Sequence, residues 1–224
     1  MKRTRLKVCC IQSVRDALLA VEAGADAIGL VAKMPSGPGP IPDDRIAEIV
    51  PCVPPPIGTF LLTSETDAES IVDHIRRTRA NTVQIVDDDV NPDVYKPIRD
   101  ELPGVKIVQV IHVQGDRSIQ KALHVSRMVD ALLLDSGNPA AEIRELGGTG
   151  RVHNWEISRQ IVEQSPKPVF LAGGINPENV AAAITRVRPF GIDVCSGVRK
   201  DGDLSREKLI QLLSAIDAAS CPLH

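Results

Sequence analysis

The chain is poor in aromatic residues: its 224 residues include one Trp, one Tyr and three Phe, or 2% of the total. Proteins that bind nucleic acid use aromatic side chains to stack on bases and a basic excess to neutralise phosphates. The formal net charge here is −3, so the chain has neither feature. These two shortages argue against nucleic acid as a partner.

A signal-peptide core and a long apolar run are also missing. The basic start Met1–Arg5 is followed by a short strand-like run that contains Lys7 and two cysteines. Such a run is neither a leader nor a membrane span, so we expect a cytoplasmic protein without a membrane partner. With 43% apolar and 25% charged residues, the chain can fill one sizeable core, and residues 1–224 are expected to form a single domain.

The cysteines do not have the spacing of a metal site or a disulfide framework. They are odd in number and form no CxxC motif: Cys9, Cys10, Cys52, Cys195 and Cys221. We therefore expect free thiols and no structural zinc.

The histidines and a run of aspartates do not indicate a metal site either. His112, His124 and His153 lack ligand spacing, and a solvated or capping role is expected for each. Asp87-Asp88-Asp89 is expected to be a solvated turn before Asn91-Pro92. No metal ion is predicted.

Strand-like and helix-like segments alternate along the chain. The strand candidates are Leu6–Cys10, Ala27–Val31, Ile57–Leu62, Thr82–Val86, Lys106–Ile111, Ala131–Leu134, Pro168–Ala172 and Gly191–Val194. The helix candidates are Ser13–Ala23, Pro42–Ile49, Asp67–Arg77, Asp93–Asp100, Asp116–Met128, Trp155–Glu163, Pro177–Val187 and Ser205–Ala218. Eight such pairs predict an α/β fold, a single (β/α)8 TIM barrel in which the first and last strands pair. An open doubly wound sheet is the alternative, but no GxGxxG follows the first strand.

Two glycine turns near the C-terminus predict a phosphate site. Gly173-Gly174 and Ser196-Gly197 each follow an apolar strand, and Asn176-Pro177 is expected to begin the next helix as N-cap and first position. Glycine lets backbone N–H groups approach a phosphate, and a helix N-terminus favours an anion. Barrels commonly bind phosphate in the loops after their seventh and eighth strands.

The carboxyl ends of the strands carry a thiol and a carboxylate. Cys9 could act as a base only as a thiolate, which needs a nearby positive charge, and a small buried residue is the commoner role of such a cysteine. Asp135 follows the apolar run Ala131–Leu134, where desolvation would raise its pKa and favour a general acid. A turn residue before Gly137-Asn138-Pro139 is the alternative. From the residues alone, both roles stay open.

Six motifs, in order along the chain, resemble those of the phosphoribosylanthranilate isomerase family. They are Lys7-Val8-Cys9 with Ile11, Gly24–Gly29, Leu133–Ser136, Gly147–Gly150 with Trp155, Leu171–Val180 and Asp193–Val198. The resemblance implies a barrel of tryptophan biosynthesis that catalyses an Amadori rearrangement of a small phosphorylated substrate, without metal or organic cofactor. It leaves monomer and homodimer open.

The resemblance also implies roles for particular residues. Cys9 corresponds to the general base and Asp135 to the general acid. The phosphate site comprises Gly148, Thr149, Gly150, Gly173, Gly174, Ser196 and Gly197. Lys7, Gln84 and Asp193 are expected to contact the substrate.

The chain departs from the family pattern at five places. Cys10 replaces a glycine, the loop around Pro38 lacks an arginine, Val86 replaces a histidine, Gln109 a lysine and Arg199 a glutamate. These changes suggest phosphate binding with altered recognition of the aryl group, and a high KM for phosphoribosylanthranilate. Two alternatives follow: a related barrel isomerase acting on another phosphorylated sugar or amino-sugar, and a catalytically silent paralogue that binds a phosphorylated ligand.

Overall fold

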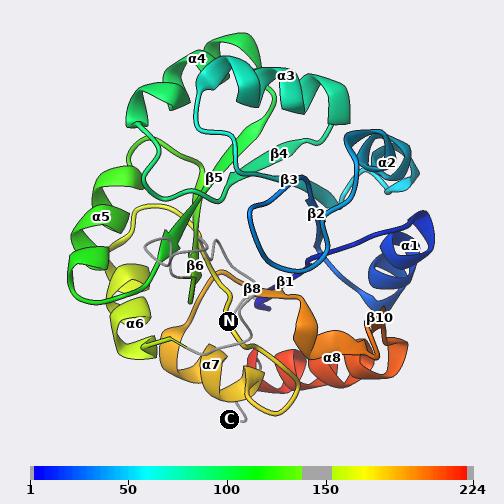
Figure 1. Cartoon of the computed structure of the whole chain (residues 1–224). Coiled ribbons are helices and arrows are strands. Elements are labelled where there is room, and N and C mark those ends of the chain that lie inside the picture. The colour runs from blue at the N-terminus through cyan, green and yellow to red at the C-terminus, as the bar shows by residue number, and fades with distance from the viewer. Residues whose placement is uncertain (1–2, 138–152, 221–224) are drawn as a thin grey trace.

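The computed structural model describes residues 3–137 and 153–220, which form a closed parallel barrel ringed by helices (Figure 1). The barrel strands are β1 (Arg5–Val8), β2 (Ala27–Val31), β3 (Gly58–Thr63), β4 (Thr82–Ile85), β5 (Lys106–His112), β6 (Ala131–Asp135), β7 (Val169–Leu171) and β8 (Gly191–Val194). Each strand pairs with its neighbours in sequence, and β1 pairs with β8 in the register Lys7↔Asp193. The predicted barrel and its closure are both confirmed.

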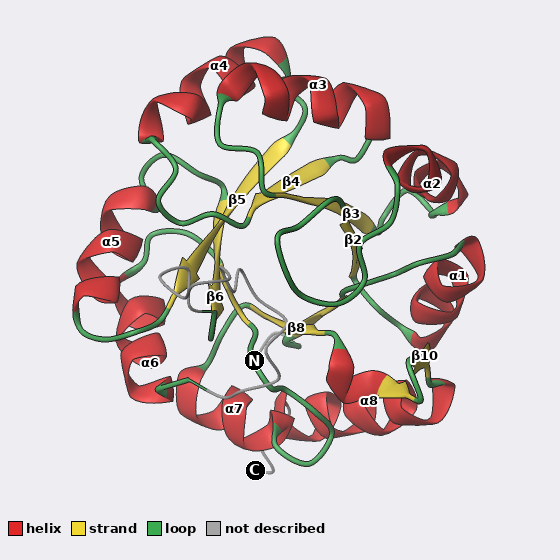
Figure 2. Cartoon of the chain, viewed as in Figure 1, coloured by secondary structure: helices red, strands yellow, loops and turns green. Residues whose placement is uncertain are grey.

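Helices cover the outer face of the strands, as Figure 2 shows. They are α1 (Val14–Ala23), α2 (Asp43–Ile49), α3 (Ala68–Thr78), α4 (Tyr95–Glu101), α5 (Arg117–Val125), α6 (Trp155–Gln164), α7 (Val180–Val187) and α8 (Arg206–Ser220). Short 3-10 helices lie at Val50–Cys52, Pro92–Val94 and Ser196–Val198, and β9 (Arg199–Lys200) pairs with β10 (Asp203–Leu204). None of the helices in the described part of the chain is long and apolar enough to span a bilayer.

Two helices begin more than one residue away from their predicted starts. The segment expected to be one helix over Asp93–Asp100 is a 3-10 turn followed by α4, and Pro97 lies in the first turn of α4, where its missing N–H leaves no bond unmade. The helix expected from Pro177 is assigned only from Val180. Asn176 instead caps the turn before α7, because its side chain accepts hydrogen bonds from the N–H groups of Glu178 and Asn179.

The alternation of strand side chains separates two cores. One set of residues packs between the strands and the helices, and the other fills the barrel interior. Phe60 and Phe170 meet edge to face inside the barrel, with ring centroids 5.9 Å apart, and Phe170 also meets the exposed Phe190 edge to face. Phe60 and Phe170 fill the amino-terminal part of the interior, and a pocket lies at the carboxyl ends of the strands.

Candidate active site

One pocket lies at the carboxyl ends of the strands and collects most of the predicted site residues. Cys9, Gln84, Asp135, Asp193, Gly173, Gly174 and Ser196 all line it. Its other lining residues are Cys10, Val31, Met34, Ser36, Gly37, Pro38, Leu62, Val86, Ala172, Ile175, Val194 and Cys195. Lys7 and Gly197 do not line it, and Gly148, Thr149 and Gly150 lie outside the described residues.

Lys7 and Asp193 form a buried ion pair across the seam between β1 and β8. The Lys7 Nζ lies 2.9 Å from Asp193 Oδ2 and 5.3 Å from the centroid of the Phe60 ring, and the Lys7 side chain is fully buried. Burial alone would lower the pKa of Lys7, but its interactions with Asp193 and, to a smaller extent, with Cys9 outweigh burial and raise the pKa. Lys7 is therefore a permanent cation inside the barrel.

Cys9 lies beside this ion pair and is a thiol at neutral pH. Burial raises its pKa to about 11, although the Lys7 charge lowers it and Asp193 raises it further. Lys7 thus acts on Cys9 in the direction that base catalysis requires, but it does not overcome desolvation. Gln84, on β4, is also buried, and its Oε1 has no hydrogen-bond partner among the described residues.

Gly29, on β2, makes room for this cluster, a role that the Gly24–Gly29 motif did not predict. A Cβ atom at Gly29 would lie 2.7 Å from Cys9 Sγ and 3.0 Å from Lys7 Nζ, so a side chain there would displace both groups. The signal was present in the sequence, since a glycine inside an apolar strand often marks close approach of another group.

Asp135 ends β6 on the pocket wall. Its Oδ1 accepts a hydrogen bond from the N–H of Ser136 at 2.7 Å. Burial raises its pKa, which is the direction predicted from its apolar strand, while the Ser136 bond and nearby His112 oppose the shift and Asp193 adds to it. The side chain therefore holds its proton at a higher pH than an ordinary carboxyl group does.

The two glycine turns pack against each other at the pocket edge. Gly173 and Gly174 have φ of 83° and 65°, which are left-handed conformations that favour glycine. Asn179 Nδ2 donates to Gly174 O at 2.8 Å and holds this turn in place. A Cβ at Gly197 would lie 2.1 Å from Ile175 O, so the second turn fits against the first only with glycine at that position.

Cys10 and Cys195 form a disulfide, so the expectation of free thiols is wrong for these two residues. They are 185 residues apart in sequence, but barrel closure sets the end of β1 beside the end of β8 and brings their Cα atoms to 5.9 Å. Cysteine spacing along the chain cannot reveal a pair made by closure. Of the described cysteines, Cys9 and Cys52 are free.

The model of the N-(5'-phosphoribosyl)anthranilate isomerase family matches residues 6–215. The chain belongs to the N-(5'-phosphoribosyl)anthranilate isomerase family. It is 36% identical over 214 residues to the isomerase of Methanocella arvoryzae, covering 93% of this chain and 98% of the relative. It is 39% identical over 204 residues to isomerase 2 of Methanosarcina mazei, covering 91% and 89%.

A solved phosphoribosylanthranilate isomerase has the same architecture. That structure, a complex with reduced 1-(o-carboxyphenylamino)-1-deoxyribulose 5-phosphate, is 25% identical to this chain with a TM-score of 0.77, and the match covers 96% of this chain and 99% of the other. The family consists of isomerases of tryptophan biosynthesis, so the chain is an isomerase of this class.

Three departures from the family pattern have different structural consequences. Val86 and Pro38 line the pocket, so these two departures change its surface. Gln109 does not line it: its side chain donates to Ile85 O and Asp87 O and accepts from the Tyr95 hydroxyl at 2.8 Å. Strand alternation places Gln109 toward the helices, so its assignment to the aryl end of the site is wrong.

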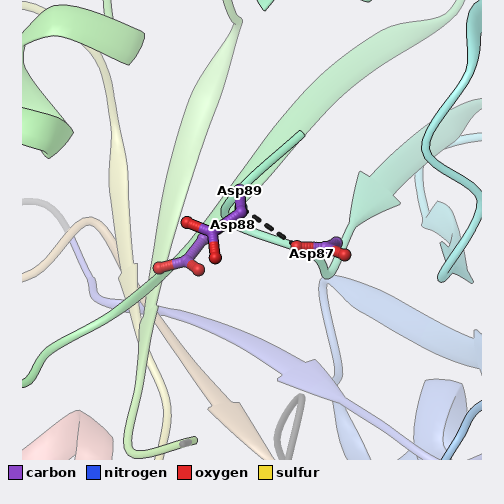
Figure 3. Close-up of side chains that lie close together, drawn as sticks. All are labelled: Asp87, Asp88 and Asp89. Carbon is purple, nitrogen blue, oxygen red and sulfur yellow. Dashed lines mark hydrogen bonds between the residues drawn. The ribbon is translucent and has the colours of Figure 1, made fainter. Parts of the chain in front are cut away.

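The carboxylate run after β4 is not the solvated turn that we expected. Asp87 and Asp88 are buried, and Figure 3 shows the hydrogen bond from Asp89 N to Asp87. Asp88 Oδ2 lies 3.3 Å from His112 Nδ1 and 3.2 Å from Lys121 Nζ. Burial alone would raise the pKa of Asp88, but the contacts with His112 and Lys121 lower it on balance. His112 is buried as well, which corrects its expected solvated or capping role.

Proposed function

We propose that this chain converts N-(5'-phosphoribosyl)anthranilate into 1-(o-carboxyphenylamino)-1-deoxyribulose 5-phosphate, with Asp135 as general acid and Cys9 as general base. One observation carries the proposal: a carboxyl group and a thiol, both with raised pKa, line the same pocket as two glycine turns. The reaction needs one proton donor, one proton acceptor and an anion cradle, and no electron carrier.

The proton transfers follow from these groups. Protonated Asp135 donates to the furanose ring oxygen, and the C1′–O bond breaks to give an open-chain imine. The Cys9 thiolate then removes the proton from C2′, and the electron pair moves to form the enolamine. Tautomerisation gives the ketose. Asp193 Oδ1 and Gln84 Oε1, which have no hydrogen-bond partner among the described residues, supply acceptors for the amine and hydroxyl groups of the substrate.

The two catalytic groups share one proton in the active form. The form with a Cys9 thiolate and a protonated Asp135 has the same net charge as the resting form with a thiol and a carboxylate. Conversion of one form into the other moves a proton between the two groups and takes up or releases no net proton, so the ratio of the two forms does not change with pH. Lys7 favours the thiolate form through its fixed positive charge.

This sharing predicts a broad bell-shaped dependence of kcat/KM on pH. As pH falls through the pKa of Asp135, both groups are protonated and the base is lost; as pH rises through about 11, both are ionised and the acid is lost. Because burial raises the pKa of Asp135, the acid limb is expected above the ordinary carboxyl range. Initial rates with freshly made substrate measure it. An acid limb near pH 4, the ordinary carboxyl value, would contradict the assignment.

The glycine turns predict a backbone phosphate site that a conservative substitution weakens. In Gly174→Ala, an L-residue at φ 65° is strained by roughly 1–2 kcal/mol, and relaxation of the turn withdraws its N–H groups. We expect the Kd for inorganic phosphate, measured by calorimetry, to rise by about tenfold. Gly202→Ala is the matched control, because Gly202 also has a left-handed φ, of 91°, but lies in the β9–β10 turn with open space around it. Equal weakening in both variants would reject the site.

Complementation of a tryptophan auxotroph that lacks this isomerase tests the proposed reaction, together with an assay on freshly made phosphoribosylanthranilate. Growth and turnover support the proposal. Turnover of another phosphorylated amino-sugar without complementation would favour a related isomerase, which the apolar Val86 on the pocket wall makes the second candidate. Phosphate binding without any turnover would identify a silent paralogue.

A further inference from the structure

Cys10 has a backbone conformation that favours glycine. Its φ is 60°, in the left-handed region, and it directly follows Cys9 beyond the end of β1. Its surroundings are filled: its Sγ lies 3.6 Å from Pro38 O, and a Cβ at Gly39 would come within 2.6 Å of the Cys10 Cβ. The loop after β2 therefore packs closely against Cys10.

Two links from the β8 side hold this conformation. The first is the disulfide to Cys195, which lies next to the phosphate turn at Ser196. The second is Arg199, whose guanidinium donates to the carbonyl oxygens of Cys10 and Cys9, the latter at 3.4 Å. Lys208 Nζ in turn donates to Arg199 O at 2.7 Å. The end of β1 that carries Cys9 is thus fixed to the wall that carries the phosphate turn.

We propose that the Cys10–Cys195 disulfide replaces a glycine as the device that keeps the backbone after Cys9 left-handed, so that the oxidation state of this pair sets the fraction of active enzyme. Cys10 and Cys195 are then positioning residues, which act through Cys9 and the phosphate turn. The inference rests on the proposed role of Cys9 for its effect on turnover.

The physical basis is a difference between glycine and every other residue. Glycine occupies the left-handed region at no steric cost, whereas an L-residue there is disfavoured by roughly tenfold in population. The bond to Cys195 removes the alternative conformations of Cys10. Without the bond, Cys10 relaxes toward negative φ, its carbonyl leaves Arg199 and the Cys9 side chain turns with it. Activity and ligand affinity then fall in proportion to the competent fraction.

The redox step is ordinary thiol–disulfide exchange with a dithiol. A thiolate of the reductant attacks the Sγ of Cys195, which is the less buried of the two residues, the S–S bond breaks, and Cys10 leaves as a thiolate that takes a proton. The second thiol of the reductant displaces Cys195 from the mixed disulfide. Two electrons and two protons pass to the protein, and the reductant becomes a disulfide.

Three variants test the proposal, assayed beside the wild type in oxidised form and after dithiothreitol. The wild type and Cys52→Ser, which removes an exposed free thiol, are expected to lose about tenfold in kcat/KM on reduction. Cys10→Gly is expected to keep the same kcat/KM under both conditions, and to exceed Cys10→Ser, because glycine reaches the left-handed conformation without the bond. Cys10→Ser is expected to match the reduced wild type under both. Alkylation and mass spectrometry count the thiols in every sample.

Ligand affinity gives a readout that does not need turnover. We expect the Kd for reduced 1-(o-carboxyphenylamino)-1-deoxyribulose 5-phosphate to rise by about tenfold on reduction of the wild type and to stay constant in Cys10→Gly. Equal behaviour of Cys10→Gly and Cys10→Ser would overturn the proposal, as would a wild type whose two new thiols appear without change in Kd or kcat/KM. A redox-dependent Kd in a protein without turnover would support this inference and reject the proposed function.

Discussion

Asp135→Asn is expected to lower kcat by at least about a hundredfold, the low end of a typical acid–base contribution. Asparagine keeps the shape of the side chain and can accept the bond from Ser136 N, but its amide protons are not acidic enough to be transferred to the ring oxygen. Stopped assays on freshly made substrate measure kcat, and the acid limb set by Asp135 is expected to give way to a residual activity that rises with pH up to the pKa of Cys9, about 11.

Asp89→Asn provides the control for Asp135→Asn. Asp89 is exposed and carries a carboxylate just after β4, at the same end of the barrel, paired with Lys121. Its removal is expected to leave kcat within about twofold, since a surface ion pair contributes little. Comparable losses in the two variants would mean that the field of the pocket, and not proton donation by Asp135, carries the effect.

Cys9→Ser is expected to lower kcat by at least about a hundredfold as well, because a hydroxyl group has a far higher pKa than a thiol and cannot serve as the base. The change is nearly isosteric, so the packing of Cys9 against Gly29 is retained. The Kd for the reduced product analogue is expected to stay within a few-fold of the wild type, which separates a catalytic loss from misfolding.

The comparison with Cys10→Ser identifies which thiol is the base. Both cysteines line the pocket, because Cys10 lies beyond the strand end and does not follow the alternation of β1. The Cys10 sulfur is bonded to the sulfur of Cys195, however, and therefore cannot ionise to a thiolate. We expect a loss of about tenfold in Cys10→Ser against at least a hundredfold in Cys9→Ser. A larger loss in Cys10→Ser than in Cys9→Ser would assign base catalysis to Cys10.

Sequence patterns predicted the parts of the molecule that depend on local structure. The bounds of β2 and β8 match the prediction, and the apolar run before Asp135 indicated the direction of its pKa shift. The position of Gln109 could also have been found, because Ile107 and Ile111 flank it with the period of two that faces the helices. The departure from the family pattern at Gln109 was the only reason to expect this residue in the pocket.

Contacts that form only when the barrel closes could not be predicted from the sequence. The Cys10–Cys195 bond joins residues whose approach depends on eight strands pairing in register, and no spacing rule covers that distance along the chain. The ionisation of Cys9 could not be predicted from the sequence either. Its pKa depends on the balance between burial, Lys7 and Asp193, which only three-dimensional placement determines. Lys7 was near Cys9 in sequence, but its partner Asp193 lies on the last strand.

The ion pair between Lys7 and Asp193 also bears on how the chain folds during synthesis. The first strand leaves the ribosome with a lysine destined for the barrel interior, and the carboxylate that neutralises it is made only with the eighth strand. A nascent chain that ends after β7 would have to bury an unpaired ammonium group in order to close, which is strongly unfavourable. The ion pair therefore delays incorporation of β1 into a closed barrel until β8 has been made. It also disfavours compact states of shorter nascent chains.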